Sequence, residues 1–306
     1  MALNNKGLSL ILFTALISGV SIFINSFGVK GFDSSVFTFS KNVVVAMLLL
    51  AVVLGSAGIG VLRRLTARQW GTLAIIGLVG GSIPFLLFFK GLQMTAGTTA
   101  AFIHKTLFVF VAVFALLWLK ERPSKGFFLG AVAILAGTYL MIRPDFSLSI
   151  GHLLVLGATV FWAAENTIAK KAVKEMSGTV VAFGRMFFGS IFILASLAVS
   201  GKASLVVAMS ASQYMWILVT AGFLFLYVFS YYNGIRHIRI STAAAMLSLG
   251  APVTASFAWA FKGIVPSTGT ALGMLLIVLG VVAVVWLAPI LSWVVRASRV
   301  GSDGRH

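Results

Sequence analysis

The fold is decided by a motif that the chain contains twice: "ERPSKGFFLGAVAILAG" at residues 121–137 and "IVPSTGTALGMLLIVLG" at residues 264–280. Each copy has Pro-Ser followed by three glycines at the same spacing. Proline and glycine stand where the backbone requires them, so this match does not arise from shared apolar composition. The chain is therefore expected to consist of two copies of one structural unit.

The repeat extends beyond this motif. With a shift of 143 residues and no gaps, residues 91–137 and 234–280 are identical at 14 of 47 positions. Upstream, "SVFTFSKNVVVAMLLLAVVLG" begins at Ser35 and "TVVAFGRMFFGSIFILASLAVSG" begins 144 residues later. Each run is almost wholly apolar but holds one cation at the same place, Lys41 in the first and Arg185 in the second. This register predicts that the two cations are related by the repeat.

The composition is that of a membrane protein. Of 306 residues, 60% are hydrophobic and 9% are charged, whereas soluble domains carry roughly a quarter charged residues. The absence of cysteine excludes thiol chemistry and disulfides. The net charge of +17 comes from basic residues scattered in twos and threes between apolar runs. Because orientation signals are distributed in this way, a nucleic-acid partner is not expected.

Ten stretches are long and apolar enough to cross a bilayer, which takes about 20 residues. They are 8–28, 36–58, 70–92, 99–119, 126–142, 151–170, 181–200, 213–233, 242–262 and 268–288. With five spans in each unit, the second unit is inverted relative to the first, an arrangement typical of secondary transporters. We therefore predict an all-α integral membrane protein with ten transmembrane helices in two inverted five-helix repeats around a central cavity. The expected units are 5–145 and 150–290, followed by a basic tail, 291–306.

The connections between spans indicate the orientation. If the N-terminus is cytoplasmic, fifteen cations fall in segments on that side and four fall on the other. Such an excess follows the positive-inside rule, so both termini and the tail are expected to be cytoplasmic. The expected location is the inner membrane of a bacterium, with the lipid bilayer as the surrounding partner.

The repeated stretches "GTTAAFIHKTLFVFVAVFALLWLKERPSKGFFLGAVAILAGTYL" (97–140) and "ISTAAAMLSLGAPVTASFAWAFKGIVPSTGTALGMLLIVLGVVAVV" (240–285) carry a family resemblance. The chain resembles the drug/metabolite transporter superfamily, in its ten-helix branch of paired EamA-type units, over residues 5–290. Glu121 matches an acidic residue that family members often carry after the fourth helix, while the second copy has Ile264 there. Within the superfamily the chain is most similar to aromatic amino acid exporters. The resemblance implies access that alternates between the two sides of the membrane.

Charged residues inside spans are costly and usually face a cavity or a partner. Glu165 is the only carboxylate within a predicted span, and Arg185 lies at a similar depth on the next one. We expect these two residues to form a buried ion pair, because matched charges cost less than lone ones. The alternative is that Glu165 carries a proton that couples transport.

The first repeat has cations without such a partner. Lys41, His104 and Lys105 sit among apolar residues with no carboxylate beside them. One hypothesis is that the substrate supplies the missing anion, for example as an amino-acid carboxylate. The alternative is that the lysines reach the headgroups or anchor helix ends.

Aromatic and polar residues near mid-span complete the predicted substrate site. Trp162 and Asn166 flank Glu165 in "FWAAENTIAK", and Tyr227 and Tyr231 share one helix face. Two prolines inside spans, Pro84 and Pro252, are predicted hinges because proline removes a helical hydrogen bond. The GxxxG pairs Gly126/Gly130 and Gly269/Gly273 predict close helix packing or a dimer contact.

Other classes of function fit less well. No nucleophile–base pair or metal-ligand spacing points to an enzyme, and neither a cofactor nor a metal is expected. No phosphate-binding loop points to an ATP-driven pump. The sequence therefore predicts a secondary carrier of small metabolites, above all neutral or aromatic amino acids, acting as an exporter or facilitator and as a monomer or homodimer. A proton-coupled exporter of drugs, nucleosides or sugars, and a ligand-binding receptor, stay open as alternatives.

Overall fold

The computed structural model describes residues 4–28, 31–144 and 149–287, and these ranges form helices without any strand. Nine helical segments in them are long and apolar enough to cross a membrane. Helix α9, with 26 residues, is long enough but is not among the nine, since it carries the buried polar residues of the centre. The predicted fold class is confirmed, while the proposed tail at 291–306 lies outside the described residues.

In the part of the first repeat that the structure describes, eight helices form five spans. They are α1 (Asn5–Gly28), α2 (Ser34–Ala57), the short α3 (Gly60–Arg63), α4 (Ala67–Gly81), α5 (Ile83–Leu92), α6 (Gly97–Lys105), α7 (Leu107–Leu119) and α8 (Lys125–Ile142). The third span is α4 followed by α5, and the fourth is α6 followed by α7.

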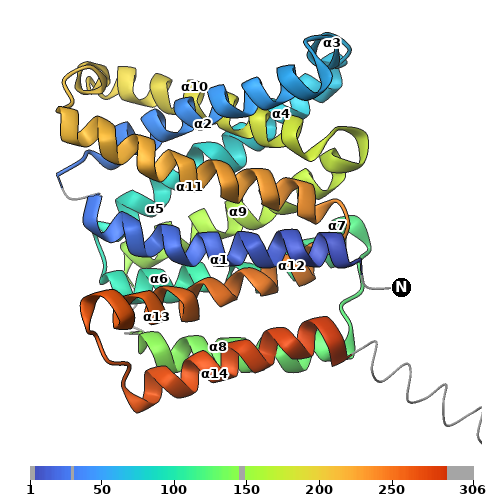
Figure 1. Ribbon diagram of the computed structural model, residues 1–306, viewed down its shortest axis with the longest axis vertical. Helices are drawn as coiled ribbons and strands as arrows, with labels where there is room; N and C mark the ends of the chain where they lie inside the picture. Colours follow the sequence, from blue (N-terminus) through green and yellow to red (C-terminus); the bar gives the residue numbers. More distant parts are fainter. Residues whose placement is uncertain (1–3, 29–30, 145–148, 288–306) are drawn as a thin grey trace, which may run out of the picture.

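The second repeat follows the same plan. Its elements are α9 (Ile150–Glu175), α10 (Gly178–Val199), the 3-10 turn η1 (Ala203–Val206), α11 (Ala211–Ile235), α12 (Ile240–Met246), the 3-10 turn η2 (Leu247–Leu249), α13 (Gly250–Lys262), α14 (Thr268–Val282) and the π-helical η3 (Ala283–Leu287). The described chain begins and ends at the same end of the bundle (Figure 1).

The two repeats interlock. α8 packs along α14 at one edge of the bundle, and α2 packs along α10 at the opposite edge (Figure 1). Between these edges, α1 of the first repeat packs on α11 of the second, and α9 of the second packs on α5 and α7 of the first. Each repeat therefore covers the other: α1 packs against helices of the second repeat, and α9 contacts helices of both.

The repeated Pro-Ser-Gly motif has a structural reason in both copies. The hydroxyl of Ser124 accepts a hydrogen bond from the first turn of α8, and that of Ser267 does the same for α14. A Cβ on Gly130 would lie 2.3 Å from the carbonyl oxygen of Gly280, and one on Gly273 would lie 2.5 Å from that of Gly137. Side chains are excluded at this distance, so the glycines serve packing between the repeats of one chain.

Three spans are interrupted within the described ranges. The third breaks at Ser82, just before Pro84, and the ninth breaks at η2, just before Pro252. The fourth breaks at Thr106 without any proline or glycine, and the sequence analysis missed this break. There the Thr106 hydroxyl donates to the carbonyl of Ile103 at 2.6 Å, a local bond that competes with regular helix.

Candidate functional site

The break in the third span supplies a backbone acceptor at the centre of the molecule. Because Pro84 has no N–H, the carbonyl of Gly80 has no helical donor four residues later. Instead it accepts hydrogen bonds from the indole Nε1 of Trp162, at 3.1 Å, and from Nη2 of Arg185, at 2.9 Å. The predicted hinge thus joins the first repeat to α9 and α10 of the second.

Glu165 packs directly against this break. A Cβ on Gly80 would lie 2.2 Å from Cγ of Glu165, so only glycine lets α9 approach so closely. The hydroxyl of Tyr232 donates to Oε1 of Glu165 at 2.5 Å. Nε of Arg185 lies 3.9 Å from the same oxygen and has no hydrogen-bond partner in the described ranges. The structure therefore brings the two predicted charges together as an ion pair without a direct hydrogen bond.

These side chains are enclosed. Glu165 and Tyr232 are each 2% exposed, Asn166 is 7% exposed and Arg185 is 9% exposed. The Tyr231 hydroxyl donates to Oδ1 of Asn166, whose Nδ2 donates to the carbonyl of Trp162 at 2.7 Å. A continuous polar network, which we call the central cluster, thus consists of the Gly80 carbonyl and the side chains of Trp162, Glu165, Asn166, Arg185, Tyr231 and Tyr232.

Aromatic rings from the first repeat line one side of the central cluster. The imidazole of His104 lies 4.8 Å from the Trp162 ring, centroid to centroid, and Phe88 lies 5.6 Å from the same ring. Phe85 approaches Trp162 edge-on at 5.2 Å. Nδ1 of His104 is buried without a hydrogen-bond partner among the described residues. This side of the cluster is an apolar wall with one unused polar atom.

The second repeat adds a further aromatic contact. The Tyr227 ring stacks on that of Tyr231, with centroids 5.9 Å apart. Both residues lie on α11, which also carries Tyr232. Two of the three tyrosines were expected at the site. Tyr232 was missed, although it makes the hydrogen bond to the carboxylate.

The remaining predicted site residues, Lys41, Lys105 and Pro252, form no hydrogen bond or ion pair with the central cluster in the described part of the chain. Lys41 is half-buried and its ammonium lies 4.6 Å from the centre of the Phe37 ring on its own helix. Lys105 has no hydrogen bond or ion pair with any residue that the structure describes. Pro252 is buried in α13, and the carbonyl of Ser248, four residues earlier, accepts from the backbone of Gly250.

Sequence reasoning also missed Asn42 and Gly80. Nδ2 of Asn42, which is 1% exposed, donates to the carbonyl of Gly81 at 3.4 Å. A signal for this site was present in "GGSIP" at residues 80–84, where two glycines precede a mid-span proline. Such a motif indicates carbonyls without helical donors, for which nearby side-chain donors can be sought.

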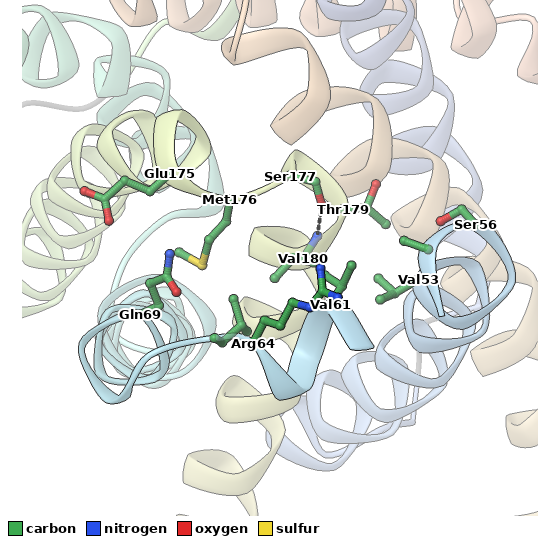
Figure 2. A pocket seen from close by; sticks show the side chains of 12 residues that line it. Val53, Ser56, Val61, Arg64, Gln69, Glu175, Met176, Ser177, Thr179 and Val180 are labelled. Carbon is green, nitrogen blue, oxygen red and sulfur yellow. Dashed lines mark hydrogen bonds between the residues drawn. The ribbon is translucent and has the colours of Figure 1, made fainter. Parts of the chain in front are cut away.

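Two pockets lie outside the central cluster. One, of about 460 Å³, opens between the end of α2, α3, the start of α4 and the α9–α10 junction. Arg64, Gln69 and Glu175 are among the residues that line it (Figure 2). The other, of about 530 Å³, is an apolar groove between α7 and α9, beside Trp118 and Phe161. Neither is lined by a residue of the central cluster.

The fold and the enclosed polar centre define a multi-pass membrane transporter built from two repeats. The EamA-like transporter family matches the chain twice, over residues 5–143 and 149–286, and the chain belongs to this family.

Individual relatives are distant. An uncharacterized transporter of Archaeoglobus fulgidus is 26% identical over 289 residues, which cover 91% of this chain and 97% of the relative. A protein of Streptantibioticus cattleyicolor named "Probable terminal-alkyne amino-acid exporter" is 26% identical, covering 87% of this chain and 89% of the relative. A solved crystal structure shares the fold with a TM-score of 0.76 at 17% identity, covering 92% of this chain and 97% of the other.

Proposed function

We propose that this protein exports neutral or aromatic amino acids across the cytoplasmic membrane of a bacterium by alternating access, as a secondary exporter or facilitator. Both termini lie in the cytoplasm in this proposal, as the positive-inside rule predicts. The observation that carries it is the central cluster, because intramembrane polar residues at the junction of inverted repeats are where carriers bind their substrates.

The aromatic wall supports this substrate class. Trp162, Phe85 and Phe88 offer ring faces and edges to an apolar side chain, and aromatic pairs add stabilisation beyond their buried area. The polar groups beside them would fix the polar end of the substrate. The amino-acid exporter among the relatives supports the same class.

Two cations supply a hypothesis about the substrate carboxylate. Lys105 and Lys41 have no carboxylate partner among the described residues. If either binds the substrate carboxylate, replacing it with glutamine weakens transport of carboxylate substrates far more than that of decarboxylated analogues. Equal losses on both kinds of substrate would contradict this role.

Proton coupling is a second candidate, favoured by one observation: Glu165 is a buried carboxylate between the two repeats. In that case transport stops when the proton gradient is collapsed.

The decisive experiment is counterflow in proteoliposomes with no ion gradient imposed. Liposomes are preloaded with one unlabelled amino acid at a time, and uptake of labelled amino acid is followed. Uptake that is accelerated by particular amino acids supports a carrier that needs no imposed proton gradient. No acceleration in any combination, with the protein folded and inserted, would contradict the proposed substrate class.

A further inference from the structure

Arg185 has far more hydrogen-bonding capacity than the protein uses. A guanidinium group carries five N–H donors in a planar fork. Among the described residues, the Arg185 side chain makes one hydrogen bond, from Nη2 to the carbonyl of Gly80, and its buried Nε has no partner. Buried polar groups are nearly always hydrogen-bonded, so an unpaired donor on a buried charge requires an explanation.

Glu165 likewise has more hydrogen-bond acceptor capacity than the described residues use. Its two carboxylate oxygens offer about four acceptor sites, and within the described chain one hydrogen bond reaches them, from Tyr232. The nearest charged atom is Nε of Arg185, at 3.9 Å, beyond hydrogen-bonding distance. A pair with a purely structural role would be expected to close this gap, because direct hydrogen bonds must offset the loss of hydration.

Both charges therefore have free capacity, they face each other, and they adjoin an aromatic wall. Trp162 lies on the same face of α9 as Glu165, and its indole donates to the same carbonyl as Arg185. An amino acid has the complementary parts: a carboxylate that fits the guanidinium fork, an ammonium that fits a carboxylate, and a side chain that can lie against rings.

We propose that Arg185 binds the carboxylate and Glu165 binds the ammonium of an amino-acid zwitterion, and that each stands in for the missing substrate group while the carrier is empty. This inference rests on the proposed function and deepens it. It assigns the carboxylate to Arg185 rather than to Lys41 or Lys105. It also makes both charges determinants of specificity, since a ligand that lacks either end leaves one buried charge unmatched.

The test measures binding to the purified full chain in detergent by equilibrium dialysis. Three labelled probes share one side chain: phenylalanine, 3-phenylpropionate, which lacks the ammonium, and phenethylamine, which lacks the carboxylate. Wild-type protein should bind phenylalanine about tenfold to a hundredfold more tightly than either analogue, the range expected for one hydrogen bond to a charged group.

The variants should change these ratios in opposite directions. E165Q should bind phenylalanine and 3-phenylpropionate about equally, while R185Q should bind phenylalanine and phenethylamine about equally. K90Q, which removes an exposed cation in the last turn of α5, is the matched control and should keep the wild-type ratios. K41Q and K105Q test the rival assignment, and they should also keep these ratios if Arg185 binds the carboxylate. Y232F, which removes the hydrogen bond to Glu165 but no charge, should weaken only the discrimination against 3-phenylpropionate.

Several outcomes would overturn the assignment. They are a wild-type protein that does not discriminate between the probes, a K41Q or K105Q variant that loses discrimination against phenethylamine, and an E165Q or R185Q variant that loses both preferences together. If a glutamine variant does not fold, E165D and R185K keep the charge and should keep its preference, with weaker binding. Wild-type counterflow is measured first: if it fails, the proposed substrate class fails, whereas counterflow without these preferences rejects the zwitterion assignment alone.

Discussion

The two repeats are equal where they hold the bundle together and unequal where they meet at its centre. At the edge formed by α8 and α14, Gly130 meets Gly280 and Gly137 meets Gly273, so each half contributes the same residues in the same roles. The match between the two copies of the sequence is strongest here because one geometric requirement acts on both.

At the centre, the second repeat supplies the charges. Glu165 and Arg185 lie on α9 and α10, while the repeat-related positions of the first repeat hold Ser21 and Lys41. The first repeat instead contributes the Gly80 carbonyl and aromatic rings. The difference shows that packing follows the symmetry of the repeat, whereas the candidate binding groups depart from it, as an asymmetric small molecule would require.

The largest expected effect on stability comes from replacing the two repeat-related cations, Arg185 and Lys41. R185Q should lower the free energy of unfolding by about 3–5 kcal/mol, because it leaves Glu165 as an uncompensated buried charge. K41Q should cost about 1 kcal/mol or less, since Lys41 is half-buried and contacts a ring. Unfolding by SDS titration in mixed micelles measures both. Similar losses in the two variants would contradict the asymmetry.

The next test concerns the symmetric edge. G130A and G273A should each lower the free energy of unfolding by about 1–3 kcal/mol, and by nearly equal amounts, because each methyl group would press on a backbone carbonyl of the facing helix. G55A is the control, since a Cβ there meets nothing within 4 Å. A clear difference between G130A and G273A would show that the edge is not symmetric.

The two helix breaks at Pro84 and Pro252 are compared through their effect on the rate of transport, which is expected to be smaller. P84A restores an N–H that can donate to the Gly80 carbonyl and displace Trp162 or Arg185, so the initial rate of counterflow should fall by about tenfold, the equivalent of one hydrogen bond. P252A is the matched variant. No described side chain donates to the Ser248 carbonyl, so the rate should change little. A wild-type rate of counterflow in P84A would show that transport does not depend on the break in the third span.

The smallest effect concerns two repeat-related helix caps. Asp33 caps α2 and Ser177 caps α10. Partial burial pushes the pKa of Asp33 upward, but its hydrogen bond from Lys202 and those from the backbone of Val36 and Ser35 outweigh this and leave the pKa below its ordinary value of 3.8. The unfolded chain therefore takes up a proton at a higher pH than the folded one.

It follows that the contribution of Asp33 to stability is present above pH 3.8 and is lost as the pH falls through the lower pKa of the folded state. The loss should be below about 1 kcal/mol, because the Lys202 side chain is largely exposed. D33S, which copies the cap of the other repeat, should lack this acid-dependent loss in unfolding curves measured from pH 5 downward. An unchanged acid dependence in D33S would assign it to other carboxylates.

Much of the fold follows from the sequence because its causes are local. Apolar length fixes the spans, Pro84 and Pro252 mark two of the three breaks, and the glycine spacing marks the α8–α14 contact. No residue in the sequence predicts the break at Thr106, because a threonine hydroxyl also bonds to nearby backbone in uninterrupted helices.

The candidate site could be predicted only in part from the sequence, because its geometry depends on how helices pack. The pairing of Glu165 with Arg185 could be predicted from the sequence, because an intramembrane carboxylate has few possible partners. Tyr231 and Tyr232 are neighbours that point about 100° apart on α11, so a helical pattern that places one at the centre does not select the other. Which tyrosine reaches which partner depends on how α9 and α11 pack.

The glycine edge between α8 and α14 also bears on how such a chain could arise. Its two faces are copies of each other, so the surface that one repeat presents there is complementary to itself. A five-helix half, inserted into the membrane in both orientations, would find in a second copy of itself the partner that the full chain holds by a covalent link. Gene fusion then adds no contact at this edge, but it frees the two halves to diverge at the centre.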